Sequence, residues 1–161
     1  METADLLAKY QSGYDSLRNE LSLIPDDAFY FRPLGQWSIA EIIVHLADSE
    51  AQGYVCAKKI IAECGGKVCV YNRQIWADKL YYDDMDYEDS LDHIKIIRKN
   101  LFKVLRLVPK ETWANYIFHP DTGKLTLAEW LALTNDHVDV HLEQIRRTLS
   151  VWREVHEKIL A

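Results

Sequence analysis

Three histidines offer the clearest chemistry in this chain. His137 and His141 are separated by three residues, and His45 lies in an apolar stretch much earlier in the sequence. Residues at i and i+4 share one face of a helix, with Cβ atoms roughly 5–6 Å apart. Both imidazoles can therefore reach one ion at about 2.0–2.1 Å from each nitrogen. With His45 contributed by a second helix, the pattern predicts a three-histidine metal site with open coordination positions.

A histidine on the apolar face of a helix is more often a hydrogen-bonded core residue than a ligand. Two neighbouring buried imidazoles, however, must each find a polar partner or share an ion. The chain has neither the H-E-x-x-H motif of zincins nor any Glu-x-x-His motif of the di-iron bundles. A mononuclear site remains, and three neutral imidazoles suit zinc, nickel, iron or copper. Three ligands also leave a position for water.

Two carboxylates lie within helical reach of His45. Glu41 is one turn before it and Asp48 is nearly one turn after it. Either carboxylate can orient the imidazole through its second ring nitrogen or act as a base near bound water. Glu41 also fits a helix cap, so Asp48 is the candidate catalytic residue. Asp136 and Asp139 should point about 100° away from their histidine neighbours, toward solvent.

Other reactive side chains carry weaker signals. His119 lies in a predicted turn upstream of the last helix, where it can line the mouth of the site. Cys56, Cys64 and Cys69 are an odd number of thiols without zinc-ribbon spacing. We interpret them as idle or buried thiols.

The composition predicts one soluble, cytoplasmic domain over residues 1–161. No apolar run approaches the ~20 residues that span a bilayer, and the N-terminus lacks the features of a secretion signal. The net charge of −6 argues against a nucleic-acid-binding surface. The basic residues should therefore lie on solvated helix faces: Arg98, Lys99, Lys103, Arg106, Arg146, Arg147 and Arg153.

The periodicity predicts an all-α protein, and no strand pattern competes with it. Ser38 with Glu41, and Thr126 with Glu129, fit capping boxes that start two of the helices. A long crossover at 67–88 contains a short helix near 74–79. The expected architecture is a four-helix bundle, either up-down-down-up or up-down-up-down. The four helices are expected at about 3–23, 38–64, 87–108 and from 127 to near the C-terminus.

The sequence segments around the three histidines resemble the signatures of the DinB/YfiT-like superfamily of metal-binding four-helix bundles. Residues 37–50 are similar to the second-helix signature, and residues 119–130 with 137–145 are similar to the last-helix signature. Residues 71–76 in the crossover are similar too. The resemblance spans essentially the whole chain and implies the same bundle, commonly paired as a homodimer.

The resemblance also implies that His45, His137 and His141 bind one divalent ion, usually zinc or nickel, with water in the open positions. Members of the superfamily include metal-dependent hydrolases, thiol S-transferases that use bacillithiol or mycothiol, and a thiol-dependent isomerase. We therefore expect a metal-dependent thiol S-transferase or hydrolase acting on a small molecule. A low-molecular-weight thiol is the expected co-substrate of the transferase, and Asp48 or bound water would move the proton.

A non-enzymatic alternative remains open. In it, the chain is a metal-stabilised bundle that acts as a binding or stress-response module. That alternative predicts an ion without a coordination position accessible to water. Neither interpretation involves a nucleic acid or a membrane.

Overall fold

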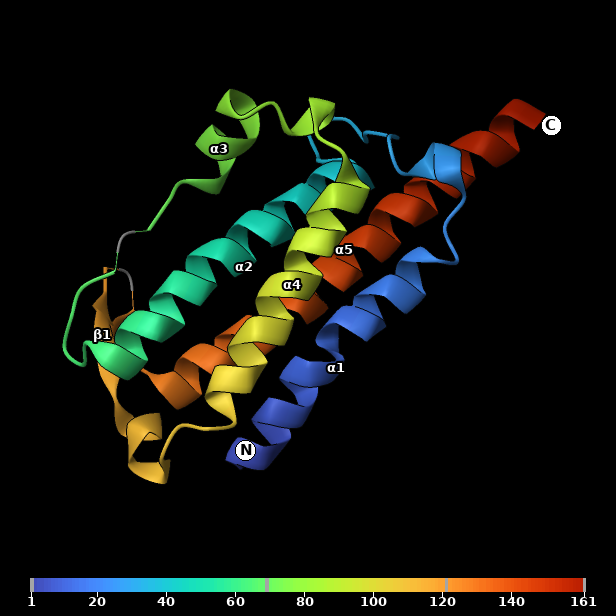
Figure 1. Cartoon of the computed structure of the whole chain (residues 1–161). Coiled ribbons are helices and arrows are strands. Elements are labelled where there is room, and N and C mark those ends of the chain that lie inside the picture. The colour runs from blue at the N-terminus through green and yellow to red at the C-terminus, as the bar shows by residue number, and fades with distance from the viewer. Residues whose placement is uncertain (1, 69, 121, 161) are drawn as a thin grey trace.

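Four long helices lie side by side in the computed structural model, which describes residues 2–68, 70–120 and 122–160 (Figure 1). Helices α2 and α4 run in one direction, and α1 and α5 run in the other. This is the up-down-down-up arrangement, one of the two predicted orders. Because α2 and α4 are parallel, the crossover between them must return along the bundle. The long helices are α1 (Thr3–Leu21), α2 (Ile39–Ala62), α4 (Tyr87–Leu105) and α5 (Leu127–Leu160).

The first two helices are consecutive in sequence but diagonal in the bundle. Helix α1 packs against α4 and α5, and α2 packs against the same two helices. The inward faces of α2 and α5 are therefore in contact. This contact brings the helix that carries His45 against the helix that carries the H-x3-H pair.

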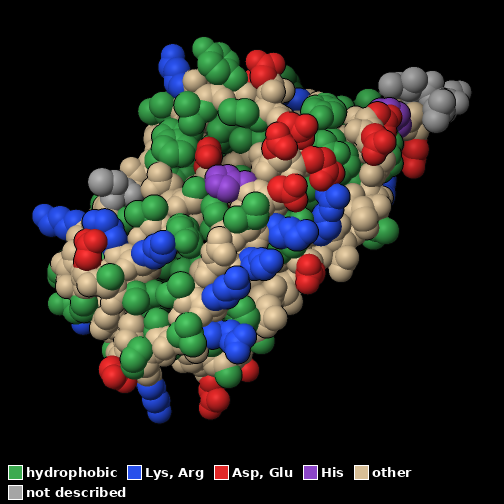
Figure 2. Space-filling model, in the orientation of Figure 1, with side chains coloured by type: hydrophobic (Ala, Val, Ile, Leu, Met, Phe, Trp, Pro, Cys, Tyr) green, Lys and Arg blue, Asp and Glu red, His purple; other side chains and the backbone are tan. Residues whose placement is uncertain are grey.

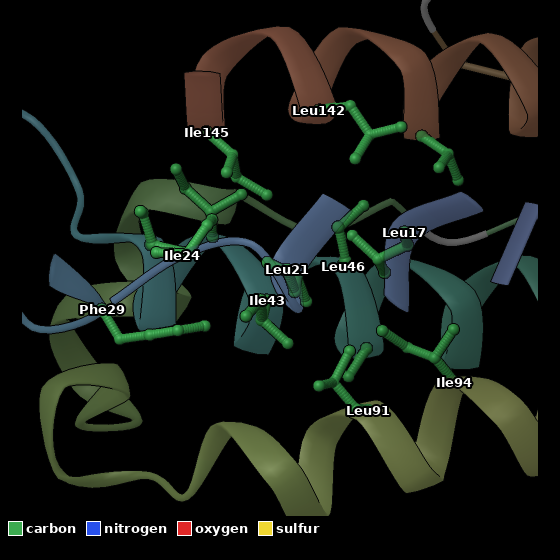
Figure 3. Packing of buried hydrophobic residues seen from close by; sticks show 14 of the residues in the cluster. Leu17, Leu21, Ile24, Phe29, Ile43, Leu46, Leu91, Ile94, Leu142 and Ile145 are labelled. Atoms are coloured by element: carbon green, nitrogen blue, oxygen red, sulfur yellow. The ribbon is translucent and has the colours of Figure 1, made fainter. Parts of the chain in front are cut away.

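Aliphatic side chains from all four long helices fill the interior (Figure 3). Full burial of each such side chain contributes roughly 1.5–3 kcal/mol, which makes this cluster a main source of stability. A second cluster fills the other end of the bundle around Tyr10, Ile60, Leu101 and Trp130. Labelled members of the first cluster include Leu17, Leu21, Ile43, Leu46, Leu91, Ile94, Leu142 and Ile145.

Both predicted capping boxes are present. The Glu41 amide donates to Ser38 Oγ at 3.2 Å, and the Ser38 amide donates to Glu41 Oε2 at 2.8 Å. The Glu129 amide likewise donates to Thr126 Oγ1 at 3.2 Å, and the Thr126 amide donates to Glu129 Oε2 at 2.9 Å. These bonds satisfy amides that have no partner within the helix, so they fix where α2 and α5 begin.

The crossover contains the predicted short helix, α3 (Arg73–Lys79). Asn72 caps it, with its side-chain oxygen accepting from the amides of Gln74 and Ile75 at 3.1 Å. Three single turns of 3-10 helix complete the connections: η1 (Asp26–Ala28), η2 (Tyr82–Asp84) and η3 (Lys110–Ala114).

A β-hairpin precedes α5, and the prediction of a chain without strands was wrong. Strands β1 (Tyr116–His119) and β2 (Gly123–Thr126) pair antiparallel. The predicted turn at 119–123 connects them; Asp121 within it lies outside the described residues. Four residues are too few for an alternating pattern to stand out. The hairpin holds the start of the crossover, because the Gly65 amide donates to the Tyr116 carbonyl at 2.7 Å and the Phe118 amide to Gly66 at 2.8 Å.

Arg98 is buried, with 4% of its surface exposed, so its predicted place on a solvated face was wrong. Its Nε donates to Glu50 Oε1 at 2.8 Å, and a further guanidinium nitrogen donates to the Tyr10 carbonyl at 3.1 Å. Glu50 is itself buried on α2, and a buried carboxylate requires such a partner. The other basic residues of α4 are exposed as predicted, and basic side chains form a stripe along that helix in Figure 2.

Within residues 2–68, 70–120 and 122–160, no helix is both long and apolar enough to cross a membrane. Cys56 is a buried free thiol and Cys64 an exposed one, and neither lies in a metal-binding group. Cys69 lies outside the described residues.

Candidate metal centre

The three predicted ligands meet between α2 and α5. The ring centroid of His45 lies 5.4 Å from that of His137 and 4.8 Å from that of His141. The ring centroids of His137 and His141 are 4.5 Å apart. One nitrogen of each ring lies within 4.8 Å of the others. Three imidazoles thus converge on one point, as the i, i+4 spacing and the contact of the two helices require.

The Nε2 atoms that face the centre of the cluster lack the protein partners that a histidine core would need. His45 Nε2 is buried without a hydrogen-bond partner. His137 Nε2 and His141 Nε2 face each other at 3.1 Å, where the two nitrogens can share only one hydrogen. A buried nitrogen without a partner costs about 1–3 kcal/mol. A divalent ion would accept lone pairs from all three rings, so this donor set fits a metal.

Burial keeps these imidazoles neutral, which is the form that binds metal. Loss of hydration, together with the smaller effect of the neighbouring imidazoles, lowers the pKa of His45 to about 3. The same cause lowers the pKa of His137 to about 4. Burial also lowers the pKa of His141, although Gln144 opposes that shift. The cluster therefore presents three uncharged donors at neutral pH.

Two neighbours orient the rings, and the sequence analysis identified neither of them in this role. Gln144 Oε1 lies 2.8 Å from His141 Nδ1, so it accepts the Nδ1 proton and leaves the Nε2 lone pair facing the cluster. The Tyr71 hydroxyl lies 3.4 Å from His45 Nδ1 and 2.6 Å from Ser49 Oγ. Gln144 follows His141 by three residues, a spacing that would have indicated it. Tyr71 arrives from the crossover, and no local spacing indicates that contact.

The two carboxylates beside His45 have other partners. The Tyr82 hydroxyl donates to Asp48 Oδ2. Glu41 is buried in the capping box and also accepts a hydrogen bond from Arg32. Neither carboxylate bonds to a histidine of the cluster in the described contacts. The orienting role considered for Glu41 therefore falls to Gln144 and Tyr71, and the catalytic role of Asp48 stays a prediction.

Of the remaining candidates, His119 comes close to the site and the two aspartates of α5 do not. His119 and His137 line the same cavity of about 360 Å³. Asp136 and Asp139 are exposed and pair with Lys9 at 3.1 and 2.7 Å, on the surface as predicted. The cavity gives the histidine cluster a route to solvent along the His137 side.

Residues 9–145 match the family model described as the DinB superfamily. The chain belongs to the DinB superfamily. The match includes all three histidines, and it covers the bundle from the second turn of α1 to the middle of α5.

Similar proteins from two bacteria are named for metal-dependent hydrolysis. One from Oceanobacillus iheyensis is 28% identical over 111 residues, which cover 69% of this chain and 64% of that protein. One from Bacillus cereus strain AH820 is 24% identical over 120 residues, which cover 73% of this chain and 69% of that protein. Each is named "Putative metal-dependent hydrolase". The match thus spans slightly under two thirds of the first relative's length.

Two solved structures share the fold. YfiT from Bacillus subtilis, described as a probable metal-dependent hydrolase with an unusual four-helix bundle topology, has a TM-score of 0.83 at 20% identity. The alignment covers 91% of this chain and 85% of YfiT. A mycothiol-dependent maleylpyruvate isomerase has a TM-score of 0.74 at 14% identity, over 90% of this chain and 61% of that one. These likenesses place this DinB chain in the same four-helix architecture.

Proposed function

We propose that the chain is a metal-dependent enzyme that binds one divalent ion, zinc or nickel, through His45, His137 and His141 and hydrolyses a small-molecule amide or ester. The observation that carries this proposal is the convergence of three neutral imidazoles, two of them buried and His137 half-buried, with His45 Nε2 lacking any protein partner. The names of the Oceanobacillus and Bacillus relatives support hydrolysis as the reaction class.

Each residue around the site has a separate task. The three histidines supply the donors. Gln144 and Tyr71 accept the Nδ1 protons of His141 and His45, which leaves the Nε2 lone pairs of those two rings free to bind the ion. When bound, the ion supplies Lewis-acid chemistry: it polarises a substrate oxygen, acidifies water or holds a thiolate. Asp48 Oδ1 is the proposed proton acceptor, while the Tyr82 hydroxyl holds Oδ2 in place.

The cavity beside His137 favours the enzyme over the non-enzymatic alternative. A purely structural metal site is closed on all sides by protein ligands. Here only three donors converge within the described residues, and one of them lines a cavity that opens to solvent. An accessible coordination position supports an enzyme. Thiol transfer would use the same open position, with the thiolate of a low-molecular-weight thiol as the entering ligand.

The decisive experiment is elemental analysis of metal in untagged protein, for wild type, His141→Ala and His93→Ala. His93 is an exposed histidine on α4 and provides the matched control. We expect about one ion per chain in wild type and in His93→Ala, and loss of the ion in His141→Ala. Absence of an ion in wild type, even after incubation with zinc or nickel, would overturn the proposal.

A panel of amides and esters then tests the reaction. Turnover that disappears in His45→Ala supports hydrolysis. If no member of the panel reacts, a Co²⁺-substituted protein should be titrated with cysteine as a model thiol. A thiolate-to-cobalt band in that titration would favour the transferase instead.

A further inference from the structure

A cavity of about 360 Å³ lies beside His137, between α2 and α5. Its outer wall comes from the start of the crossover and from the hairpin. The two segments are fastened together, because the Val68 amide donates to the Phe118 carbonyl at 3.4 Å and the Phe118 amide donates to the Gly66 carbonyl. The cavity is therefore bounded by hydrogen-bonded backbone on one side and by two long helices on the other.

Most of the lining is apolar. Val68 and Val70 come from the crossover, Leu125 from β2, and Trp130 and Leu133 from α5. Apolar cavities of about 150 Å³ bind benzene. The volume here is more than twice as large, so it has room for a body the size of two fused rings.

The polar side chains of the lining are largely engaged by the protein itself. Glu50 is paired with Arg98, and the Thr134 hydroxyl donates to the Trp130 carbonyl at 2.9 Å. No Lys or Arg side chain lines the cavity among the described residues. Away from the ion proposed at His137, a charged ligand body would therefore lose hydration without gaining an opposite charge. The Gln52 side chain lines the cavity and makes no hydrogen bond to another described residue, so its side-chain amide is available to a ligand.

We propose that this cavity binds the substrate's body, an uncharged apolar group of up to two rings with one hydrogen-bonding atom for Gln52, and presents its reactive group on the His137 side. This inference rests on the proposed function, since it assigns the cavity to the substrate of the metal site. It also narrows the substrates to test, from small amides and esters in general to aryl and branched-alkyl ones without charge.

Binding of 1-naphthol, a neutral fluorescent probe of two fused rings with one hydroxyl for Gln52, tests the proposal. Naphthalene-1-sulfonate has the same two rings and a negative charge. We expect saturable binding of one neutral probe per chain and at least tenfold weaker binding of the sulfonate. Equal affinity for the two probes, or no saturable binding of the neutral one, would refute the proposal.

Two matched variants show whether the probe occupies this cavity. Leu133 lines it and is 52% exposed, and Val140 lies two turns later on the same helix, is 60% exposed and does not line it. Leu133→Asp should weaken binding of the neutral probe at least tenfold, whereas Val140→Asp should change it less than twofold. An equal effect of the two substitutions would place the probe elsewhere and overturn the assignment.

Metal content, measured on the same preparations, separates this inference from the proposed function. Probe binding in a protein that takes up no zinc or nickel would sink the metal-dependent enzyme and with it the assignment of the cavity to that enzyme's substrate. Full metal content without probe binding would leave the metal site standing and overturn the cavity proposal alone.

Discussion

At the scale of single residues, Tyr71 tests whether the surroundings of the histidines matter as much as the histidines themselves. Its hydroxyl lies between His45 Nδ1 and Ser49 Oγ. Tyr71→Phe keeps the ring and removes the acceptor for the Nδ1 proton. We expect affinity for Zn²⁺, measured by competition with a chromophoric chelator, to fall about 10–100-fold.

Tyr54→Phe is the control for Tyr71→Phe. Tyr54 is a half-buried tyrosine of α2 whose ring lies under Lys58, away from the cluster. Its removal should leave Zn²⁺ affinity unchanged. An equal loss of affinity in both variants would mean that Tyr71 acts through general stability and not through His45.

The histidines should also make the metal-free protein sensitive to acid. Folding lowers the pKa of His45 from 6.5 to about 3 and that of His137 to about 4. As the pH falls below about 6.5, the unfolded chain therefore binds protons first, and the free energy of unfolding decreases. Each histidine contributes up to about 1.4 kcal/mol per pH unit, until the pH reaches its folded pKa.

Urea unfolding in the presence of EDTA, at several pH values between 7 and 5, measures this slope. His45→Gln removes one of the titrating groups and should flatten the decrease. A variant that loses stability with pH as steeply as wild type would show that His45 is not held neutral in the fold.

At the scale of elements, the packing of α1 against α4 depends on one glycine. Alanine is favoured over glycine inside a helix by about 1 kcal/mol. A Cβ at Gly13 would nevertheless lie 2.3 Å from an Arg98 nitrogen, and that guanidinium is fixed by Glu50 and the Tyr10 carbonyl. Gly13→Ala should therefore destabilise the protein, by about 1–3 kcal/mol, because it displaces a buried charge from its partners.

Gly53→Ala is the matched substitution on α2. Its Cβ would meet Trp130 at 3.4 Å, an ordinary packing distance. Here the helix preference should prevail, and stability should rise by up to about 1 kcal/mol. Thermal or urea unfolding compares the two variants, and stabilisation by Gly13→Ala would contradict the role given to Arg98.

The same elements show how far sequence alone leads. Helices α2 and α5 were predictable because their capping boxes and apolar stripes are local signals. The convergence of His45, His137 and His141 could be predicted from those stripes, since the apolar faces of both helices had to be buried. The Arg98–Glu50 pair could not be predicted, because its members lie on different helices and each looks solvated in its own helix. The hairpin was missed because its four-residue strands are too short for an alternating pattern to stand out. The Tyr71 contact was missed because it depends on how the crossover packs, which no short-range pattern encodes.

At the scale of the whole molecule, the face shown in Figure 2 separates acidic from basic side chains along the bundle. In Figure 2, acidic side chains gather around the start of α4 and basic ones along its remainder. This order matches the helix dipole, which favours acids at the N-terminus and bases toward the C-terminus. The dipole acts mainly within the first and last turns, so it accounts for Glu88, Asp89 and Lys103, while the absence of a nucleic-acid partner stays a prediction. The homodimer implied by the family resemblance stays a prediction.

Metal removal should lower the stability of the whole bundle, because the three donors join α2 to α5. An ion that binds only the folded state stabilises it by about 2.7 kcal/mol when its free concentration is one hundred times Kd. For a chain of this size, each kcal/mol raises Tm by about 2–4 °C. Adding Zn²⁺ to the EDTA-treated protein should therefore raise Tm by about 5–10 °C. The same addition to His141→Ala should leave Tm unchanged, since two imidazoles on separate helices bind far more weakly than three. Calorimetry of both proteins, with and without Zn²⁺, measures the difference, and an equal rise in the variant would show that the ion binds somewhere other than the bundle core.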